Sequence, residues 1–174
     1  MLTKSDALIF GGFFLILIEI FLIIRKVGIK KNVLIGLFVM YITLALSVTL
    51  FPIPFQELYP SGYTHNFVPF KSITSSFNAG IRPFLSSVVG NIILTMPFGF
   101  LITMILKNKY FKTIILFIVS FSLMIELLQL FIGLGIGYWY RNVDIDDLIL
   151  NTIGGILGWG IYKITPKKIL GILE

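Results

Sequence analysis

The sequence lacks cysteine altogether and is poor in charged residues. Without cysteine the chain cannot be a disulfide-stapled secreted domain, and with one histidine it is a poor candidate for a multi-histidine metal site. Charged residues make up 13% of the 174 residues, whereas soluble globular proteins contain about 25%. Hydrophobic residues reach 57%, aromatic residues 15%, and the mean hydropathy is +0.99. A water-soluble domain of this size could not bury so much apolar surface, so the composition indicates a membrane protein.

The net charge of +6 raises the question of a nucleic-acid partner. The 14 basic residues, however, occur in short clusters between long apolar stretches. This distribution is typical of membrane topology, in which Lys and Arg mark the cytoplasmic loops, and not of a surface that follows phosphates. We therefore expect membrane lipids as partners and no nucleic acid.

Five stretches are long and apolar enough to cross a bilayer, which takes about 20 residues of helix. The last stretch is the least hydrophobic, because it contains Asn151 and four glycines. Two of these, Gly154 and Gly158, have the small-xxx-small spacing that predicts the close approach of another helix. The sequence thus predicts an all-α integral membrane protein, a five-helix transmembrane bundle that forms a single domain over residues 1–174. The expected helices are 7–24, 33–51, 85–106, 113–134 and 147–164.

The distribution of Lys and Arg between the loops predicts the orientation, because cytoplasmic loops carry the excess. Ten basic residues lie on one side of the expected bundle and four on the other. We therefore expect the N-terminus outside and the C-terminus in the cytoplasm, in a multi-pass protein of the plasma membrane. The ten are Arg25, Lys26, Lys30, Lys31, Lys107, Lys109, Lys112, Lys163, Lys167 and Lys168, and the four are Lys4, Lys71, Arg82 and Arg141.

Two outer loops are rich in residues that favour the membrane interface. The longer loop, 52–84, contains five prolines, so a long regular helix is not expected there. Six of its aromatic residues predict that it lies along the interface. In the shorter loop, Tyr138, Trp139 and Tyr140 predict an anchor at the headgroups. The six aromatic residues of the longer loop are Phe55, Tyr59, Tyr63, Phe67, Phe70 and Phe77.

Three of the expected helices each carry polar residues on one face. A spacing of three or four residues places side chains on the same side of a helix. Amide and ionisable groups are costly inside a membrane, so they are functional-site hypotheses by default. They are Asn91 and Thr95 in 85–106, then Ser122, Glu126 and Gln129 in 113–134, and finally Asp144, Asp147 and Asn151 around the start of 147–164.

The expected orientation places these polar groups at similar depths. At about 1.5 Å per residue, Glu126 lies about 10 Å below the outer boundary, Asn91 about 9 Å and Asn151 about 6 Å. Arg141 and the aspartates within 144–147 follow directly above them. The spacing therefore predicts one polar pocket that opens to the outside.

Each polar residue also has a purely structural interpretation. Asp144 and Asp147 could cap the start of the fifth helix. Glu126 could be held by an ion pair with Arg141, because buried charges are normally paired. Carboxylates alone could bind a hard cation, but the sequence does not favour this, and we predict neither a metal nor a cofactor. Two further amides could form hydrogen bonds between helices without any chemistry, and these are Asn91 and Gln129.

Four blocks of the sequence have a recognisable pattern in a consistent order. The most specific is Arg-x-x-Asp-x-x-Asp-x-x-x-Asn-x-x-Gly-Gly within 141–155, and the others are 66–70 (NFVPF), 91–100 and 122–129, which contains a Glu-x-x-Gln pair. In these blocks the chain resembles the VanZ-like family of bacterial membrane proteins, which is named after a protein associated with resistance to the glycopeptide teicoplanin. The resemblance leaves Asp146 outside the family pattern, so we rank it lower. The polar positions that the resemblance implies are Asn91, Glu126, Gln129, Arg141, Asp144, Asp147 and Asn151.

Two classes of function remain open from the sequence. The first is an envelope protein whose outer pocket binds a polar or lipid-linked ligand, such as a cell-wall precursor or a glycopeptide antibiotic. The second is an enzyme that acts on a lipid headgroup such as a polyprenyl phosphate, with Glu126 and Asp147 as acid and base and Arg141 holding the phosphate. A scaffold and a transporter component are further alternatives, although a transporter site is expected near the membrane midplane.

Overall fold

A computed structural model describes residues 1–54, 65–106 and 110–172 of the chain. Phe55, Tyr59 and Tyr63 of the expected outer loop, and Lys107 and Lys109 of the expected inner loop, lie outside the described residues. The described part is helical throughout its regular structure. Its elements are α1 (Lys4–Ile24), α2 (Ile29–Leu50), α3 (Lys71–Asn78), α4 (Ile81–Phe84), a π-helical segment η1 (Leu85–Val89), α5 (Gly90–Ile105), α6 (Phe111–Ile136), α7 (Ile145–Ile164) and α8 (Lys167–Leu170).

The long helices coincide with the apolar stretches of the sequence, with small shifts at their ends. α1 begins earlier than expected because Thr3 and Asp6 form a capping box that satisfies the first backbone N–H groups. α4, η1 and α5 form one helical stretch, Ile81–Ile105, because Pro83 falls in its first turn, where no hydrogen bond is lost. α7 begins at Ile145 because Asp144 is its N-cap.

Four helices of the described chain are long and apolar enough to cross a membrane. They are Lys4–Ile24, Ile29–Leu50, Ile81–Ile105 and Phe111–Ile136. The chain is therefore an all-helical membrane protein. α7 has 20 residues, a sufficient length, but Asp146, Asp147 and Asn151 lower its hydropathy and it is not among the four. The fifth span and the orientation of the termini remain predictions.

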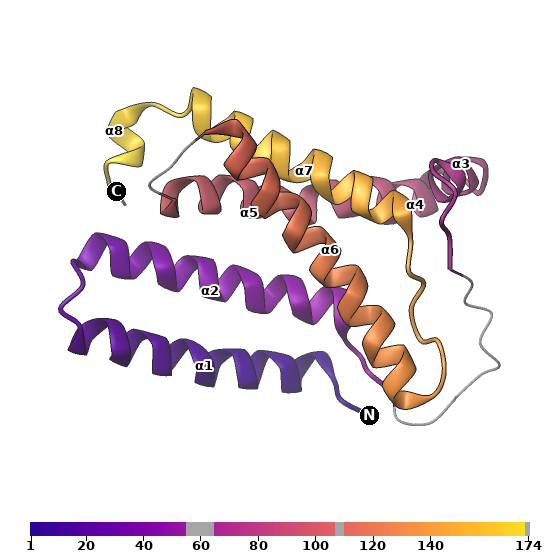
Figure 1. Ribbon diagram of the computed structural model, residues 1–174, viewed down its shortest axis with the longest axis horizontal. Helices are drawn as coiled ribbons and strands as arrows, with labels where there is room; N and C mark the ends of the chain where they lie inside the picture. Colours follow the sequence, from indigo (N-terminus) through magenta and orange to yellow (C-terminus); the bar gives the residue numbers. More distant parts are fainter. Residues whose placement is uncertain (55–64, 107–109, 173–174) are drawn as a thin grey trace.

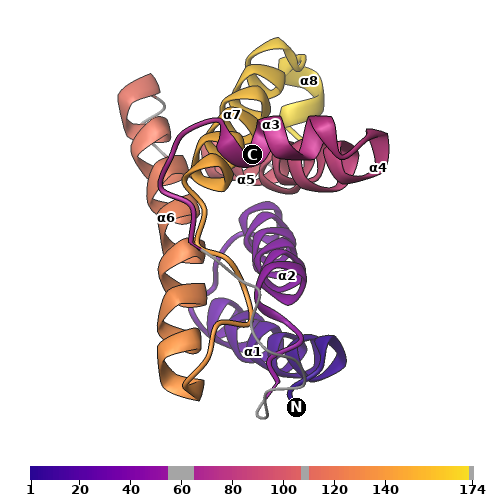
Figure 2. The same ribbon diagram turned by 90° about the vertical axis from the view of Figure 1, so that its right-hand side faces the viewer.

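The helices form two pairs that α6 joins, of which α1 and α2 are antiparallel and α5 and α7 are parallel. Figure 1 shows α1 beside α2 and α5 beside α7, with α6 crossing diagonally, and Figure 2 shows α6 extending from one pair to the other. The N-terminus, the α3–α4 region and the start of α7 lie at one end of the molecule, which we call the N-terminal end. The α1–α2 turn and α8 lie at the opposite end.

The packing of α7 fixes where its polar residues lie. A Cβ added at Gly154 would overlap the carbonyl oxygen of Ile92, and one at Gly158 would overlap that of Met96, so α7 contacts α5 backbone to backbone. This is the close approach that the small-xxx-small spacing predicts. The rings of Phe98 and Phe121 stack with centroids 4.1 Å apart and join α5 to α6 in the apolar core. α5, α6 and α7 thus present their polar faces to one another.

Candidate functional site

Polar side chains gather where the start of α7 meets α6, α5 and the segment before α3. We call this group the polar cluster. It contains four carboxylates, two amides and one hydroxyl, whose partners are described below. Its members are Asn66, Ser72, Asn91, Glu126, Asp144, Asp146 and Asp147.

Asp144 is the centre of the polar cluster and the N-cap of α7. Its Oδ1 accepts hydrogen bonds from the backbone N–H of Asp146 and from Nδ2 of Asn66, both at 2.9 Å. The hydroxyl of Ser72 donates to its Oδ2. The capping role is the structural interpretation considered for Asp144, and the side chain is buried while performing it. Its carboxylate therefore ties α7 to a segment more than seventy residues earlier in the chain.

Glu126 reaches the start of α7 from the middle of α6. Its Oε2 accepts a hydrogen bond from the backbone N–H of Asp144 at 3.0 Å, and the side chain is 5% exposed. A helix N-terminus carries partial positive charge and free N–H groups, so it stabilises a carboxylate placed there. The structure thus gives Glu126 a neutral partner in place of the ion pair with Arg141 that was considered as its structural interpretation.

Arg141 and Gln129 instead hold the end of α2. The guanidinium of Arg141 donates from Nη2 to the carbonyl oxygens of Phe51, at 3.0 Å, and Val48, at 3.4 Å. Nε2 of Gln129 donates to the carbonyl of Thr49 at 3.1 Å. The last carbonyls of a helix have no partner within it, so both side chains satisfy acceptors that would otherwise be free. Within the described chain no ion pair joins Arg141 to Glu126.

The contact between α5 and α7 is the more open side of the polar cluster. Nδ2 of Asn91 donates to Oδ1 of Asp147 at 2.5 Å, and both residues are partly exposed. Deeper along the same pair of helices, the hydroxyl of Thr95 donates to the carbonyl of Asn151 at 2.8 Å. Asn91 therefore forms the interhelical hydrogen bond considered as its structural interpretation, and it orients the carboxylate of Asp147.

Asp146, which the sequence ranks lower, is completely buried. Its Oδ1 accepts from the backbone N–H of Phe70, and its Oδ2 accepts from those of Ser72, at 2.8 Å, and Ile73, at 3.2 Å. These N–H groups form the start of α3, so a carboxylate of α7 caps a second helix. The one sequence signal of this contact is the NFVPF block immediately before α3, because a recognisable loop motif indicates that the loop has a fixed structure.

Asn66, the first residue of that same block, also belongs to the polar cluster, although the helical spacing of polar residues does not predict it. Its backbone N–H donates to Val143 and its carbonyl accepts from Ile145, both at 2.9 Å, so it forms an isolated parallel β-bridge with Asp144. The side-chain amide adds the hydrogen bonds to Asp144 and Ser72. Hydrogen bonds therefore hold segment 66–73 against the start of α7.

Neutral groups surround the four carboxylates of the polar cluster. Among the described residues, no Lys, Arg or His side chain forms an ion pair with Glu126, Asp144, Asp146 or Asp147. Backbone N–H groups, amides and hydroxyls solvate them instead. No group of three or more potential metal ligands in the described chain has the arrangement of a metal site.

Several further polar atoms beside the polar cluster are buried without a hydrogen-bond partner in the described structure. Burial raises the pKa of the Tyr140 hydroxyl, although the nearby Arg141 guanidinium acts in the opposite direction, so this hydroxyl stays protonated and can donate. The amide oxygens among these atoms are acceptors and the hydroxyls are both donors and acceptors. The atoms are Oγ of Ser122, Oε1 of Gln129, the hydroxyl of Tyr140 and Oδ1 of Asn151.

Comparison with known proteins gives matches over the part of the chain that builds the site. The model of the VanZ/LLP1 family matches residues 38–166. Protein VanZ of Enterococcus faecium is 26% identical over 132 residues, which cover 76% of this chain and 74% of that protein. No solved structure matches the chain. The matched range contains every residue of the polar cluster.

Proposed function

The chain belongs to the VanZ/LLP1 family, and we propose that it binds a polar or lipid-linked ligand of the bacterial cell envelope at the polar cluster. The ligand is a cell-wall precursor or a glycopeptide antibiotic, and binding changes susceptibility to glycopeptides. The protein crosses the plasma membrane five times, with α7 as the fifth span and the polar cluster towards the outside.

One observation carries this proposal: four carboxylates lie together without a cationic partner among the described residues. Each accepts hydrogen bonds from neutral groups of the chain, so no cation of the described residues is paired with these acceptor oxygens. Such a site favours a ligand with ammonium, amide N–H or hydroxyl donors, because charge-assisted hydrogen bonds are about twice as strong as neutral ones. Peptide and amino-sugar parts of cell-wall precursors and of glycopeptides have these donors.

Asp147 is the point of first contact in this proposal. It is partly exposed, and Asn91 orients its carboxylate towards α5. Glu126 and Asp144 lie behind it and are buried, so they provide the hydrogen-bonding framework. The unpartnered oxygens of Asn151 and Ser122 lie one turn deeper along α7 and α6 and would receive further donors of the ligand.

The positions of the basic residues in the fold support the proposed orientation. The N-terminal end of the molecule holds the polar cluster, whereas the α1–α2 turn and α8, which are rich in Lys and Arg, lie at the other end. Under the positive-inside rule the polar cluster then faces the outer leaflet, where lipid-linked precursors and antibiotics are found.

Antibiotic susceptibility tests the proposal in cells. Wild-type protein and the variants Glu126→Gln and Asp147→Asn are expressed in a susceptible bacterium, and the minimal inhibitory concentration of teicoplanin is measured at matched protein levels. Glu19→Gln is the matched control. Glu19 is also a carboxylate in a helix, but it lies near the C-terminal end of α1, away from the polar cluster, and accepts a hydrogen bond from Asn32. We expect both site variants to lose the effect of the wild type and the control to keep it. Retention of the full effect by both site variants would exclude the polar cluster as its cause.

An enzyme acting on a lipid headgroup is the second candidate, and one observation favours it. Glu126 is buried while Asp147 is partly exposed, and carboxylates in two such different environments can serve as acid and base. Purified protein would then convert a polyprenyl phosphate or a similar lipid, and Glu126→Gln would abolish turnover. If the lipid is unchanged after prolonged incubation, the enzymatic candidate is excluded and only the binding function remains.

A further inference from the structure

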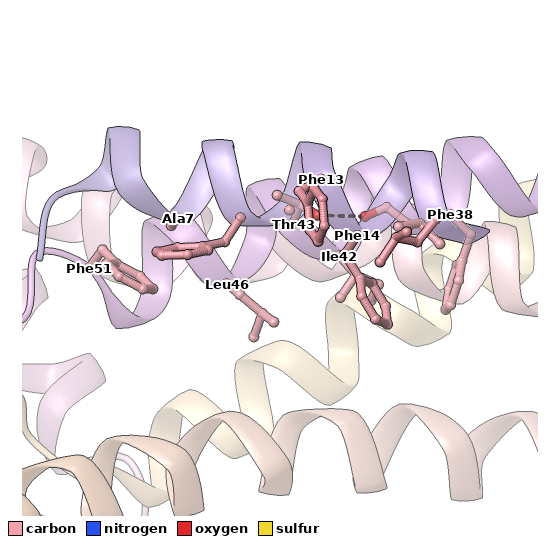
Figure 3. Close-up of a pocket in the computed structure, with 12 residues that line it drawn as sticks. Ala7, Phe13, Phe14, Phe38, Ile42, Thr43, Leu46 and Phe51 are labelled. Atoms are coloured by element: carbon pink, nitrogen blue, oxygen red, sulfur yellow. Dashed lines mark hydrogen bonds between the residues drawn. The ribbon is translucent and has the colours of Figure 1, made fainter. Parts of the chain in front are cut away.

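An apolar groove runs along α1 and α2 in the half of the molecule that contains the N-terminus, and the two helices pack closely at its floor, where a Cβ added at Gly11 would overlap Thr43. Its volume is about 660 Å³, within the range of sites for small molecules, which is roughly 300–1,000 Å³. Figure 3 shows Ala7 and Phe51 at one end of the groove and Phe38 at the other. The hydroxyl of Thr43, a polar lining residue, donates to the carbonyl of Val39 at 3.0 Å and is therefore occupied. The groove thus offers an apolar ligand contact with aromatic and aliphatic side chains such as Phe10, Phe14, Leu17, Ile42 and Leu46.

The length of this α1–α2 groove matches one leaflet of a bilayer. From Ala7 to Leu17 it follows eleven residues of α1, which are ten helical rises or about 15 Å, half of a hydrocarbon core of about 30 Å. In the other half a polar contact lies between the two helices, because Nδ2 of Asn32 donates to Oε2 of Glu19 at 2.7 Å. A partner helix that crosses the membrane would need a groove along the full length of α1. A single lipid chain needs only one leaflet.

Positive charge lies at the end of the groove marked by Phe51. The carbonyl of Phe51 accepts from Nη2 of Arg141, so the guanidinium is fixed beside a residue that lines the groove. Lys4, in the first turn of α1, is a second cation at this end. The nearby acid, Asp6, is bound by Thr3 in the capping box. The end of the groove therefore suits a phosphate.

We propose that the α1–α2 groove binds one acyl chain of an anionic phospholipid, with the lipid phosphate beside Arg141. The bound chain lies along the α1–α2 pair and covers lining side chains that are otherwise exposed, such as Phe10, Phe13 and Phe14. The described residues that line the groove include none of the polar cluster. The lipid site is therefore separate from the proposed ligand site, and each can fail without the other.

Photocrosslinking with a single lipid tests this proposal. Full-length protein in detergent is mixed with an equimolar amount of phosphatidylglycerol that carries a diazirine on one acyl chain, and crosslinked peptides are mapped by mass spectrometry. We expect crosslinks at lining residues such as Phe10, Phe14 and Leu46. Ala7→Trp, which fills the end of the groove, lowers the crosslinking yield about tenfold. The matched control is Ile9→Trp, because Ile9 lies on α1, is 69% exposed and does not line the groove.

A second arm of the experiment examines the headgroup. Wild-type protein crosslinks phosphatidylglycerol several-fold more than diacylglycerol with the same chain, and Arg141→Gln removes this preference. Circular dichroism and size-exclusion chromatography verify that each variant is folded and monodisperse. Crosslinks spread evenly over the exposed face of α1, or equal yields in Ala7→Trp and Ile9→Trp, would overturn the proposal. A wild-type dimer that Ala7→Trp dissociates would also overturn it, because the groove would then bind a second copy of the chain.

Discussion

The carboxylate of Glu126 accepts a hydrogen bond of 3.0 Å from the backbone N–H of Asp144, the residue that caps α7. This contact joins the middle of one long helix to the beginning of the next. It also places an acid where the partial charge of a helix N-terminus stabilises it. The side chain of Asp144 continues the connection to Asn66 and Ser72. Three segments distant in the sequence are thereby fixed around one buried carboxylate.

Replacing Glu126 should separate its structural contribution from its charge. Glu126→Ala leaves the N–H of Asp144 without its acceptor in a buried place, which costs about 1–3 kcal/mol. Glu126→Gln keeps an acceptor oxygen of the same reach and costs less. We expect the alanine variant to have the lower midpoint of thermal unfolding in detergent. Equal midpoints for the two variants would show that the hydrogen bond to Asp144 does not contribute to stability.

Asp146 should control the order of α3. Asp146→Ala removes the acceptor of three backbone N–H groups, those of Phe70, Ser72 and Ile73. Because each buried donor that loses its partner costs about 1–3 kcal/mol, hydrogen exchange in 70–73 should accelerate about tenfold or more. Asp6→Ala is the control, since Asp6 accepts only from Thr3 in α1. Unchanged exchange in 70–73 would contradict the capping of α3 by α7.

Two glycines of α7 provide a matched test of helix packing. A Cβ at Gly158 would overlap the backbone of α5, whereas one at Gly160 would meet nothing within 4 Å. Gly158→Ala should lower the unfolding midpoint because α5 and α7 must move apart. Gly160→Ala should be neutral or stabilising by about 0.5–1 kcal/mol, because alanine favours the helix more than glycine does. A similar change in both variants would argue against the backbone-to-backbone contact.

The absence of cysteine allows a direct test of topology. Single cysteines are introduced as Lys4→Cys and Lys168→Cys and labelled in intact cells with a membrane-impermeant maleimide. We expect labelling at position 4 alone, because five spans place the two ends on opposite sides. Permeabilised cells, in which both positions should react, provide the control. Labelling of both positions in intact cells would leave α7 outside the membrane or change the number of spans.

The sequence predicts the long helices well because their apolar stretches and their glycine spacing are local signals. The hydrogen bonds within the polar cluster are different, since Asn66 and Ser72 meet Asp144 and Asp146 across more than seventy residues. Helical periodicity carries no information about such a contact. Arg141 is the basic residue closest in sequence to Glu126 on the outer side, which suggests an ion pair between the two. The free carbonyls at the end of α2 bind Arg141 instead, because a helix C-terminus offers several unpaired acceptors at once.

Direct binding to the purified protein tests the central claim, that the polar cluster recognises an envelope ligand. The full chain is reconstituted in lipid nanodiscs, and its affinity for teicoplanin and for a lipid-linked cell-wall precursor is measured by titration. We predict saturable binding of one of these ligands, which Asp147→Asn and Glu126→Gln each weaken about tenfold or more and Glu19→Gln leaves unchanged. Absence of saturable binding for both ligands, or equal affinity in all four proteins, would contradict this account.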